Sequence, residues 1–140
     1  MPLLSRRGLL AITAVIDVAL HRDGPRVSAK SLAVRHALPA RHLEPILQAL
    51  VRDGILRGVR GPRGGYELAR AQRSITADDI LRAAGTIEDG EADRMGSLLL
   101  TDVVSPAVSQ AEKSFSSALA RINVEDLVRK AEPLREGLSA

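Results

Sequence analysis

The chain has 140 residues, 45% of them hydrophobic, which is enough for one small domain with a core. It contains no cysteine, which excludes disulfides, thiolate metal sites, cysteine-ligated iron–sulfur clusters and thiol nucleophiles. The net charge of +3 is the sum of +7 over residues 1–70 (12 basic, 5 acidic) and −4 over residues 71–140 (8 basic, 12 acidic). This asymmetry is typical of a polyanion-binding half joined to a half with another role. Arginines solvated on an ordinary surface are the alternative.

The N-terminal stretch predicts a helix that Ser5 caps and that residues 23–25, Asp-Gly-Pro, bring to an end. Apolar residues recur along it at helical spacing and predict a buried stripe of Leu9, Ile12, Ile16, Ala19 and Leu20. Arg6 and Arg7 lie in the first turn, where the helix dipole disfavours cations, so they are candidates for contacts with the DNA backbone; two solvated arginines are the alternative. Asp17 interrupts the apolar run, which argues against a signal peptide or membrane span, and we expect a cytoplasmic protein.

A short helix over residues 29–36, a tight connection and a second helix beginning at Pro39 form a helix-turn-helix pattern, whose second helix enters the major groove. Ser28 caps the first helix and is a further DNA-backbone candidate. Pro39 suits the first helical position, because its fixed backbone angle matches the helix and its missing N–H would be unpaired there. The apolar face of the second helix consists of Leu43, Ile46, Leu47 and Leu50. Pro45 is expected to kink this helix without breaking it.

Gly54 ends that helix, and two strands follow, over residues 55–59 and 66–69. The loop between them reads Arg60-Gly61-Pro62-Arg63-Gly64-Gly65. Its three glycines let the backbone approach a surface closely while the arginines present guanidinium groups, which suits a minor groove or a row of phosphates; a simple turn is the alternative. A phosphate-binding P-loop does not fit, because a strand follows and no Gly-Lys-Ser/Thr is present.

Thr76 caps a fourth predicted helix, which Gly85 ends, and an acidic linker follows over residues 86–96. The acidic side chains of this linker are Glu88, Asp89, Glu91 and Asp93. They could hold a hard cation through oxygen, but their spacing matches no defined loop motif and favours a solvated loop. The three histidines, His21, His36 and His42, all lie in the basic half, so we expect no metal site and predict satisfied or solvated side chains.

The C-terminal part predicts a long helix in which Ser105-Pro106 either begins the helix or kinks a longer one. A heptad seam runs along it through Val104, Val108, Ala111, Phe115, Ala118 and Ile122. This seam suits one neighbouring helix, and we expect it to form a homodimer interface, since an operator with two half-sites requires a two-fold protein; the back wall of a monomer is the alternative. Asn123 caps a last helix over residues 124–131.

The stretch LEPILQALVRDGILRGVRGPRGGYELA resembles the Rrf-two family of winged helix-turn-helix transcription regulators, which includes the bacterial iron–sulfur-cluster regulator. Its most specific part is the string from Val59 to Tyr66, VRGPRGGY. The resemblance implies a dimer held by the long C-terminal helix, a recognition helix in the major groove and Arg60 in the minor groove. Cluster-bearing members have three cysteines in the segment equivalent to residues 86–100, and this chain has none, so we expect no cofactor.

Carried over by position, the resemblance also implies which residues contact DNA. The base-reading part of the recognition helix would be Pro39, Ala40, Arg41, His42, Glu44 and Pro45. The wing would contact DNA through Arg60, Gly61, Arg63, Gly64 and Gly65. Glu44 occupies the family's acidic reader, which can accept a hydrogen bond from a cytosine amino group. Pro45 stands where other members have a hydrogen-bonding side chain, so their operator preferences do not transfer.

We therefore expect a mainly α fold with a small β-hairpin wing. Residues 1–85 would form the winged helix-turn-helix domain, residues 86–96 the linker, and residues 97–140 the dimerisation helix and a last helix. The predicted function is a sequence-specific transcriptional regulator that binds a pseudo-palindromic operator in double-stranded DNA as a homodimer and represses. A protein-interaction module, or a regulator controlled by a protein partner or small ligand, is the alternative. No nucleophile–base–acid set or metal constellation indicates an enzyme.

Overall fold

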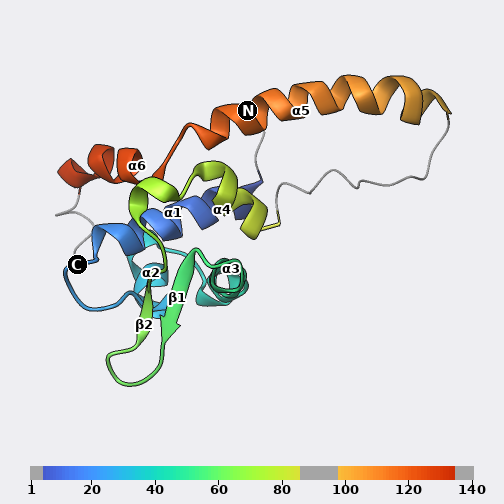
Figure 1. The fold of residues 1–140 in the computed structure, drawn as a ribbon. Helices are drawn as coiled ribbons and strands as arrows, with labels where there is room; N and C mark the ends of the chain where they lie inside the picture. Colours follow the sequence, from blue (N-terminus) through green and yellow to red (C-terminus); the bar gives the residue numbers. More distant parts are fainter. Residues whose placement is uncertain (1–4, 86–97, 135–140) are drawn as a thin grey trace.

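The computed structural model describes residues 5–85 and 98–134. Its helices are α1 (Arg6–Leu20), α2 (Ala29–His36), α3 (Ala40–Arg52), α4 (Ala77–Ala83), α5 (Ser105–Ala120) and α6 (Val124–Ala131). The strands β1 (Leu56–Val59) and β2 (Gly65–Leu68) form a two-stranded antiparallel hairpin. In Figure 1, α2, α3 and the hairpin lie on one side of α1, while α4, α5 and α6 lie on the other. The mainly helical fold with a hairpin wing is confirmed, and no described helix is long and apolar enough to cross a membrane.

Helix α1 forms the centre of the core and packs against α3, α4, α6 and β2. Its predicted buried stripe is wrong in part: Leu9 is exposed, and Ile12 and Ile16 are only half-buried. The side chains that are buried instead are Ala11, Ala14, Val15 and Val18, with Ala19 and Leu20 as predicted. The reason is that α1 has neighbours on several sides, and small side chains let those helices approach closely.

The helix-turn-helix begins where predicted, with Ser28 capping α2 by accepting from the N–H of Ser31 at 3.0 Å. Ala37 adopts a left-handed conformation, φ +52°, and turns the chain toward α3. The prediction that Pro39 is the first helical residue is wrong by one position. Pro39 stays extended, with ψ +128°, and its carbonyl accepts from the N–H of His42, so α3 begins at Ala40. Pro45 lies inside α3, which continues to Arg52.

The hairpin pairs Arg57 with Glu67 and Gly58 with Tyr66. Its strands differ from the prediction by one residue at three of their four ends. Val27, in the loop between α1 and α2, forms a bridge to the hairpin, because the N–H of Tyr66 donates to its carbonyl at 2.7 Å. The wing is therefore tied to the segment that leads into the helix-turn-helix.

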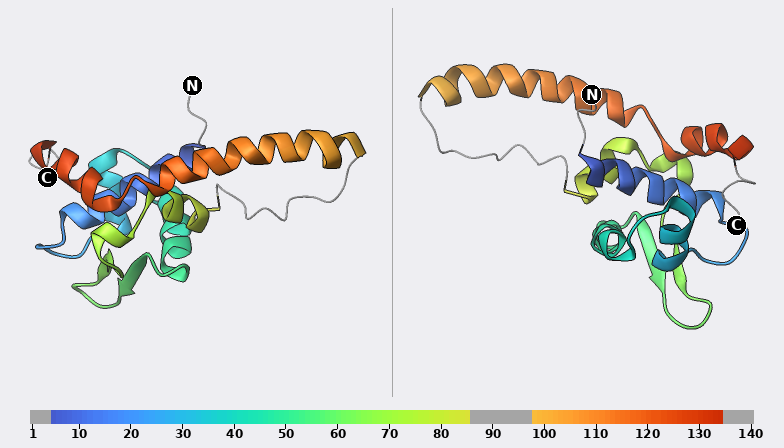
Figure 2. Two further views of the ribbon diagram at one scale, coloured as in Figure 1. Left: turned by 45° about the horizontal axis from the view of Figure 1, so that its top comes forward. Right: turned by 180° about the vertical axis from the view of Figure 1, so that it is seen from behind.

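The C-terminal helices return to the same core. Thr76 caps α4 and Asn123 caps α6, as predicted, and the N–H of Ala77 donates to the carbonyl of Ile122 at 2.8 Å. A π-helical turn, Leu100–Val104, precedes α5, so the helix that contains Pro106 is longer than α5 itself. Proline has no N–H to donate to the carbonyl four residues earlier, and a local π turn accommodates that loss. Figure 2 shows the first turns of α5 extending beyond the rest of the fold.

Candidate nucleic-acid interface

The exposed face of α3 and the wing enclose a groove of about 560 Å³, which we call the reading groove. It is lined by Ser28, Ala29, Glu44, Gln48, Val59, Gly61, Pro62, Gly64, Gly65 and Tyr66. The apolar stripe of α3 is buried as predicted, so the polar residues of the helix are turned outward. Gln48 lies one turn after Glu44 on this face and was missing from the predicted reading set. The i, i+4 spacing of the two residues is the signal that identifies it.

Close packing at the tip of the wing explains two of its glycines. A Cβ at Gly64 would lie 2.2 Å from the carbonyl oxygen of Val59, so no side chain fits there. Gly65 has φ +141°, and a Cβ there would lie 2.7 Å from the carbonyl oxygen of Val27. The Gly-Gly pair is thus required for the hairpin to close against the segment that leads into α2.

Two arginines hold the wing through Glu67. Arg57 donates from Nη2 to Oε1 of Glu67 at 2.9 Å across the hairpin, and Nε of Arg26 lies 3.4 Å from Oε2 of the same carboxylate. Arg26 also donates to the carbonyl of Arg63 at 3.3 Å. The hydrogen bond from Arg57, with the charge of Arg26, lowers the pKa of Glu67 below its ordinary value. Sequence reasoning did not identify Arg26 as a support of the wing.

On the described surface of α3 and the wing, three arginines remain available for a polyanion. Arg41, Arg60 and Arg63 are exposed, and none of them forms an ion pair within residues 5–85 and 98–134. Arg60 lies between Val59 and Gly61, which both line the reading groove. Guanidinium groups without an internal partner keep their donors free for phosphates or base edges. Ala40, His42 and Pro45 are exposed on α3 as well.

The other residues predicted to contact the DNA backbone differ in their exposure and in their hydrogen-bond partners. Nε of Arg7 donates to the carbonyl of Ala84 at 2.8 Å, at the end of α4, so this group has an internal partner. Arg6 is exposed in the first turn of α1. Ser28 is half-buried at the N-terminus of α2, where its hydroxyl takes part in the capping box with Ser31, and it lines the reading groove.

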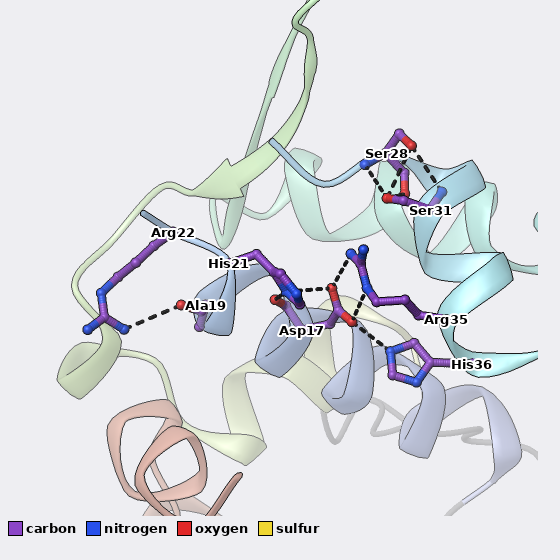
Figure 3. Close-up of polar contacts among 8 residues, drawn as sticks. All are labelled: Asp17, Ala19, His21, Arg22, Ser28, Ser31, Arg35 and His36. Atoms are coloured by element: carbon purple, nitrogen blue, oxygen red, sulfur yellow. Dashed lines mark hydrogen bonds and ion pairs between the residues drawn. The ribbon is translucent and has the colours of Figure 1, made fainter. Parts of the chain in front are cut away.

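A buried carboxylate holds the helix-turn-helix to α1 (Figure 3). Asp17 is 2% exposed and accepts from Nε and Nη2 of Arg35 at 3.0 and 2.7 Å and from Nε2 of His36 at 2.7 Å. Nδ1 of His21 lies 3.3 Å from Oδ1 of Asp17. We call these four residues the Asp17 cluster. Burial alone would raise the pKa of Asp17, but the hydrogen bonds from Arg35 and His36 outweigh it and lower that pKa.

The Asp17 cluster was not predicted, although Asp17 was noted as an interruption of an apolar run. The signal for it is that interruption together with Arg35-His36 at the end of the next helix, because buried carboxylates require cationic partners. The prediction that the histidines are satisfied or solvated is confirmed for His36 and His42: His36 is bonded and His42 is exposed. His21 is satisfied at Nδ1, whereas its Nε2 is buried without a partner among the described residues.

The predicted seam of α5 divides between two surroundings. Phe115 is half-buried against the cluster of Ala77, Leu81 and Leu119, which joins α5 to α4. The rest of the seam is exposed in the single chain, namely Val104, Val108, Ala111, Ala118 and Ile122. Leu119, outside the seam, is the most deeply buried residue of α5. The acidic linker, including Glu88, Asp89, Glu91 and Asp93, lies outside the described residues.

Comparison with known proteins identifies the family. Residues 4–130 match the model of the Rrf2 family, described as iron-dependent transcriptional regulators. A putative helix-turn-helix transcriptional regulator of Azotobacter vinelandii, ORF2, is 30% identical, over 90% of this chain and 84% of that protein. The regulator IscR of Xenorhabdus nematophila is 31% identical, over 94% of this chain and 82% of that protein.

Solved structures agree with this assignment. The structure of T. potens IscR has a TM-score of 0.72 and 32% identity, and the match covers 94% of this chain and 89% of that one. CymR, the global cysteine regulator of B. subtilis, has a TM-score of 0.68 and 28% identity over 93% of this chain and 98% of that one. The family and these relatives are transcriptional regulators, not enzymes.

Iron held by cysteine thiolates does not fit this chain, which has no cysteine. Within residues 5–85 and 98–134, no group of three or more His, Asp or Glu side chains is arranged to hold a metal ion. The family description therefore carries over for the fold and for regulation of transcription, not for an iron–sulfur cluster. The chain belongs to the Rrf2 (Rrf-two) family and is a DNA-binding, helix-turn-helix regulator of transcription.

Proposed function

We propose that this regulator binds a pseudo-palindromic operator as a homodimer, with α3 in the major groove and the wing against the minor groove or its phosphates. The observation that carries the proposal is the reading groove, in which Glu44 and Gln48 of α3 face the wing. Arg41, Arg60 and Arg63 are exposed beside it without an ion pair among the described residues. Polar side chains at the centre and arginines at the border suit base contacts and phosphate contacts, respectively.

Specificity in this proposal comes from α3. The carboxylate of Glu44 can accept from a cytosine amino group, and the amide of Gln48 can pair with adenine through N6 and N7. Pro45 offers no donor between them, which leaves that position to shape and apolar contact. Each favourable base contact of this kind contributes about 1–3 kcal/mol of discrimination.

Dimerisation in this proposal uses the exposed part of the seam on α5. Val108 is 50% exposed and Val104 is 43% exposed in the single chain, and Leu98, Leu99 and Val103 are more exposed still. An apolar row on a helix that extends beyond its own fold is best covered by the same row of a second chain. The first 85 residues would then read DNA, and the segment from residue 97 onward would join two copies.

We propose that the regulator acts in the cytoplasm. We propose repression as its effect, because a dimer bound across promoter DNA excludes polymerase without further machinery. No iron–sulfur cluster takes part in this proposal, since the thiolate ligands are missing from the sequence. The signal that controls the regulator would then act through a small ligand or another protein.

The test is to select genomic fragments bound at physiological salt and then to titrate the enriched site. Arg60→Ala is compared with wild type and with Arg73→Ala, a matched loss of an exposed arginine outside the reading groove. If Arg60 contacts a phosphate, its removal reduces the slope of log affinity against log salt by about one. If Arg60 occupies a narrow minor groove, its removal relaxes A·T preference. Sequence-blind binding by the wild type, or an Arg60→Ala variant that equals wild type in affinity, slope and selectivity, would contradict the proposal.

A further inference from the structure

Helices α1 and α6 leave a cavity of about 240 Å³ between them, which we call the α1–α6 cavity. It is lined by Ile12, Thr13, Ile16, Asp17, Leu20, His36, Leu127 and Ala131. It lies outside the reading groove and shares no residue with it. Drug-sized ligands occupy pockets of about 300–1,000 Å³, so this volume suits a smaller molecule, about the size of one substituted ring.

The walls of the cavity are aliphatic, and its polar groups are few. The hydroxyl of Thr13 already donates to the carbonyl of Leu9 at 2.9 Å. Asp17 directs its carboxylate to Arg35 and His36, as Figure 3 shows. An apolar pocket with a small number of placed polar groups is the usual form of a small-molecule site.

Among the described residues that line the cavity, His36 has a polar atom left for a ligand. An ionised carboxylate can only accept, so the 2.7 Å contact between Asp17 and Nε2 of His36 requires the proton on Nε2. In the neutral imidazole, Nδ1 then carries a lone pair and acts as an acceptor. Within residues 5–85 and 98–134, Nε2 is the ring nitrogen of His36 that forms a hydrogen bond, and the side chain is 18% exposed, so Nδ1 remains accessible to a ligand. His36 lines the cavity, and the contact with Asp17 fixes the orientation of its ring, so Nδ1 is the ring nitrogen left for a donor on a ligand.

The charges around the cavity select a neutral ligand. No lysine or arginine of residues 5–85 and 98–134 lines it, so an anionic ligand would lose its hydration without a permanent counter-charge from this part of the chain. A cationic ligand would compete with Arg35 for Asp17, whose two oxygens are already bonded. A neutral hydroxyl avoids both costs, because it can donate to Nδ1 while the apolar body fills the space between α1 and α6.

We propose that the α1–α6 cavity is a binding site for a small neutral phenol or alcohol, held by aliphatic contacts from α1 and α6 and by a hydrogen bond to Nδ1 of His36. Such a ligand would contact α1, the last residue of α2 and α6 together. The site thus adjoins the first helix of the helix-turn-helix without overlapping the surface that reads DNA.

The test uses 4-methylphenol as the probe with full-length protein, followed by calorimetry and by NMR of the His36 ring and the isoleucine methyl groups. Anisole is the matched comparison, because it is an isomer with the same heavy-atom count and no donor. We expect saturable binding of one 4-methylphenol per chain, with shifts at His36, Ile12 and Ile16. Anisole should bind about tenfold more weakly, which corresponds to the loss of one hydrogen bond.

Two substitutions localise the binding. Ala131→Leu fills the cavity from α6 and should reduce affinity at least about tenfold, whereas Ala120→Leu, the same change at an exposed position on α5, should leave it unchanged. If Ala131→Leu lowers the melting temperature, Leu127→Phe repeats the test from another wall. Absence of saturable binding, equal affinity for anisole, or binding that survives the filling substitution would overturn the proposal. DNA affinity is measured separately, so failure here leaves the proposed function intact.

Discussion

Arg35 binds Asp17 through two N–H groups, with Nε 3.0 Å from Oδ2 and Nη2 2.7 Å from Oδ1. The pair joins α2, the first helix of the helix-turn-helix, to the central helix α1. Its side chains are 10% and 1% exposed, so neither charge is compensated by solvent. A buried pair of this kind is costly to break from one side, because the remaining charge stays buried without a partner.

Replacing that carboxylate is therefore expected to destabilise the fold. Asp17→Asn keeps the shape of the side chain but leaves Arg35 without its counter-charge, and the free energy of unfolding should fall by about 3–5 kcal/mol. Urea denaturation at neutral pH measures it. Glu67→Gln removes a carboxylate of the wing that pairs with two arginines at the surface, and it should have a much smaller effect. Equal effects of the two substitutions would show that the Asp17 cluster is not a principal support.

The stabilisation by Asp17 should persist to acidic pH. Burial raises the pKa of Asp17, but the hydrogen bonds from Arg35 and His36 outweigh it, so the folded pKa lies below the ordinary value of 3.8. A lowered folded pKa gives stability that is complete above the unfolded pKa and is lost as pH falls through the folded one. The difference in unfolding free energy between wild type and Asp17→Asn should thus stay constant down to about pH 4 and shrink below it. Urea titrations at successive pH values measure this difference, and a difference that vanished well above about pH 4 would contradict the prediction.

Two alanine substitutions in the wing should separate the steric effect of an added Cβ from the loss of a glycine's backbone freedom. Gly64→Ala places a Cβ 2.2 Å from the carbonyl oxygen of Val59, so the loop must distort at a cost of about 1–3 kcal/mol, and operator affinity should fall with it. Gly58→Ala, in the same hairpin, would meet the ring of Tyr66 at an ordinary 3.8 Å. Thermal melts and DNA titrations of both variants provide the comparison. A Gly64→Ala protein with wild-type operator affinity would refute the packing argument.

The seam of α5 can be tested without DNA. Val108→Asp introduces two carboxylates into an isologous interface, one from each chain, and should weaken dimerisation by at least about a hundredfold. Gln110→Asp makes a comparable addition of charge two residues away, on another face of the helix, and should leave the dimer intact. Light scattering coupled to gel filtration reports the mass. A Val108→Asp protein that remains dimeric at low micromolar concentration would place the interface elsewhere.

The sequence predicted the elements that obey local rules. The side chains of the helix caps accept hydrogen bonds from the expected N–H groups at Ser5, Ser28, Thr76 and Asn123. A capping contact involves only the first turn of the same helix, so it can be predicted from neighbouring residues in the sequence. The stripe on α1 was predicted less well, since α1 has several neighbours and helical periodicity alone does not tell which of its faces each neighbour covers.

In the candidate site, too, residues in a local motif were predicted, whereas residues that depend on contacts distant in the chain were not. The wing motif identified Arg60 and the glycines, and the structure adds the steric reason for Gly64. The Asp17 cluster and Arg26 depend on contacts between residues distant in the chain, such as the 2.7 Å bond from Arg35 to Asp17. A single sequence gives no measure of such tertiary pairing. The family resemblance identified Glu44, and the spacing of four residues between Glu44 and Gln48 on the helix could have added Gln48.

The most direct measurement is the stoichiometry and half-site dependence of operator binding. A duplex that carries the selected operator is titrated with protein beside a duplex in which one half-site is scrambled. We expect two chains per intact operator, with affinity for the scrambled duplex lower by at least about a hundredfold, because only one recognition helix then reads its bases. One chain per operator, with equal affinity for the two duplexes, would contradict a dimer that reads DNA through α3 and the wing.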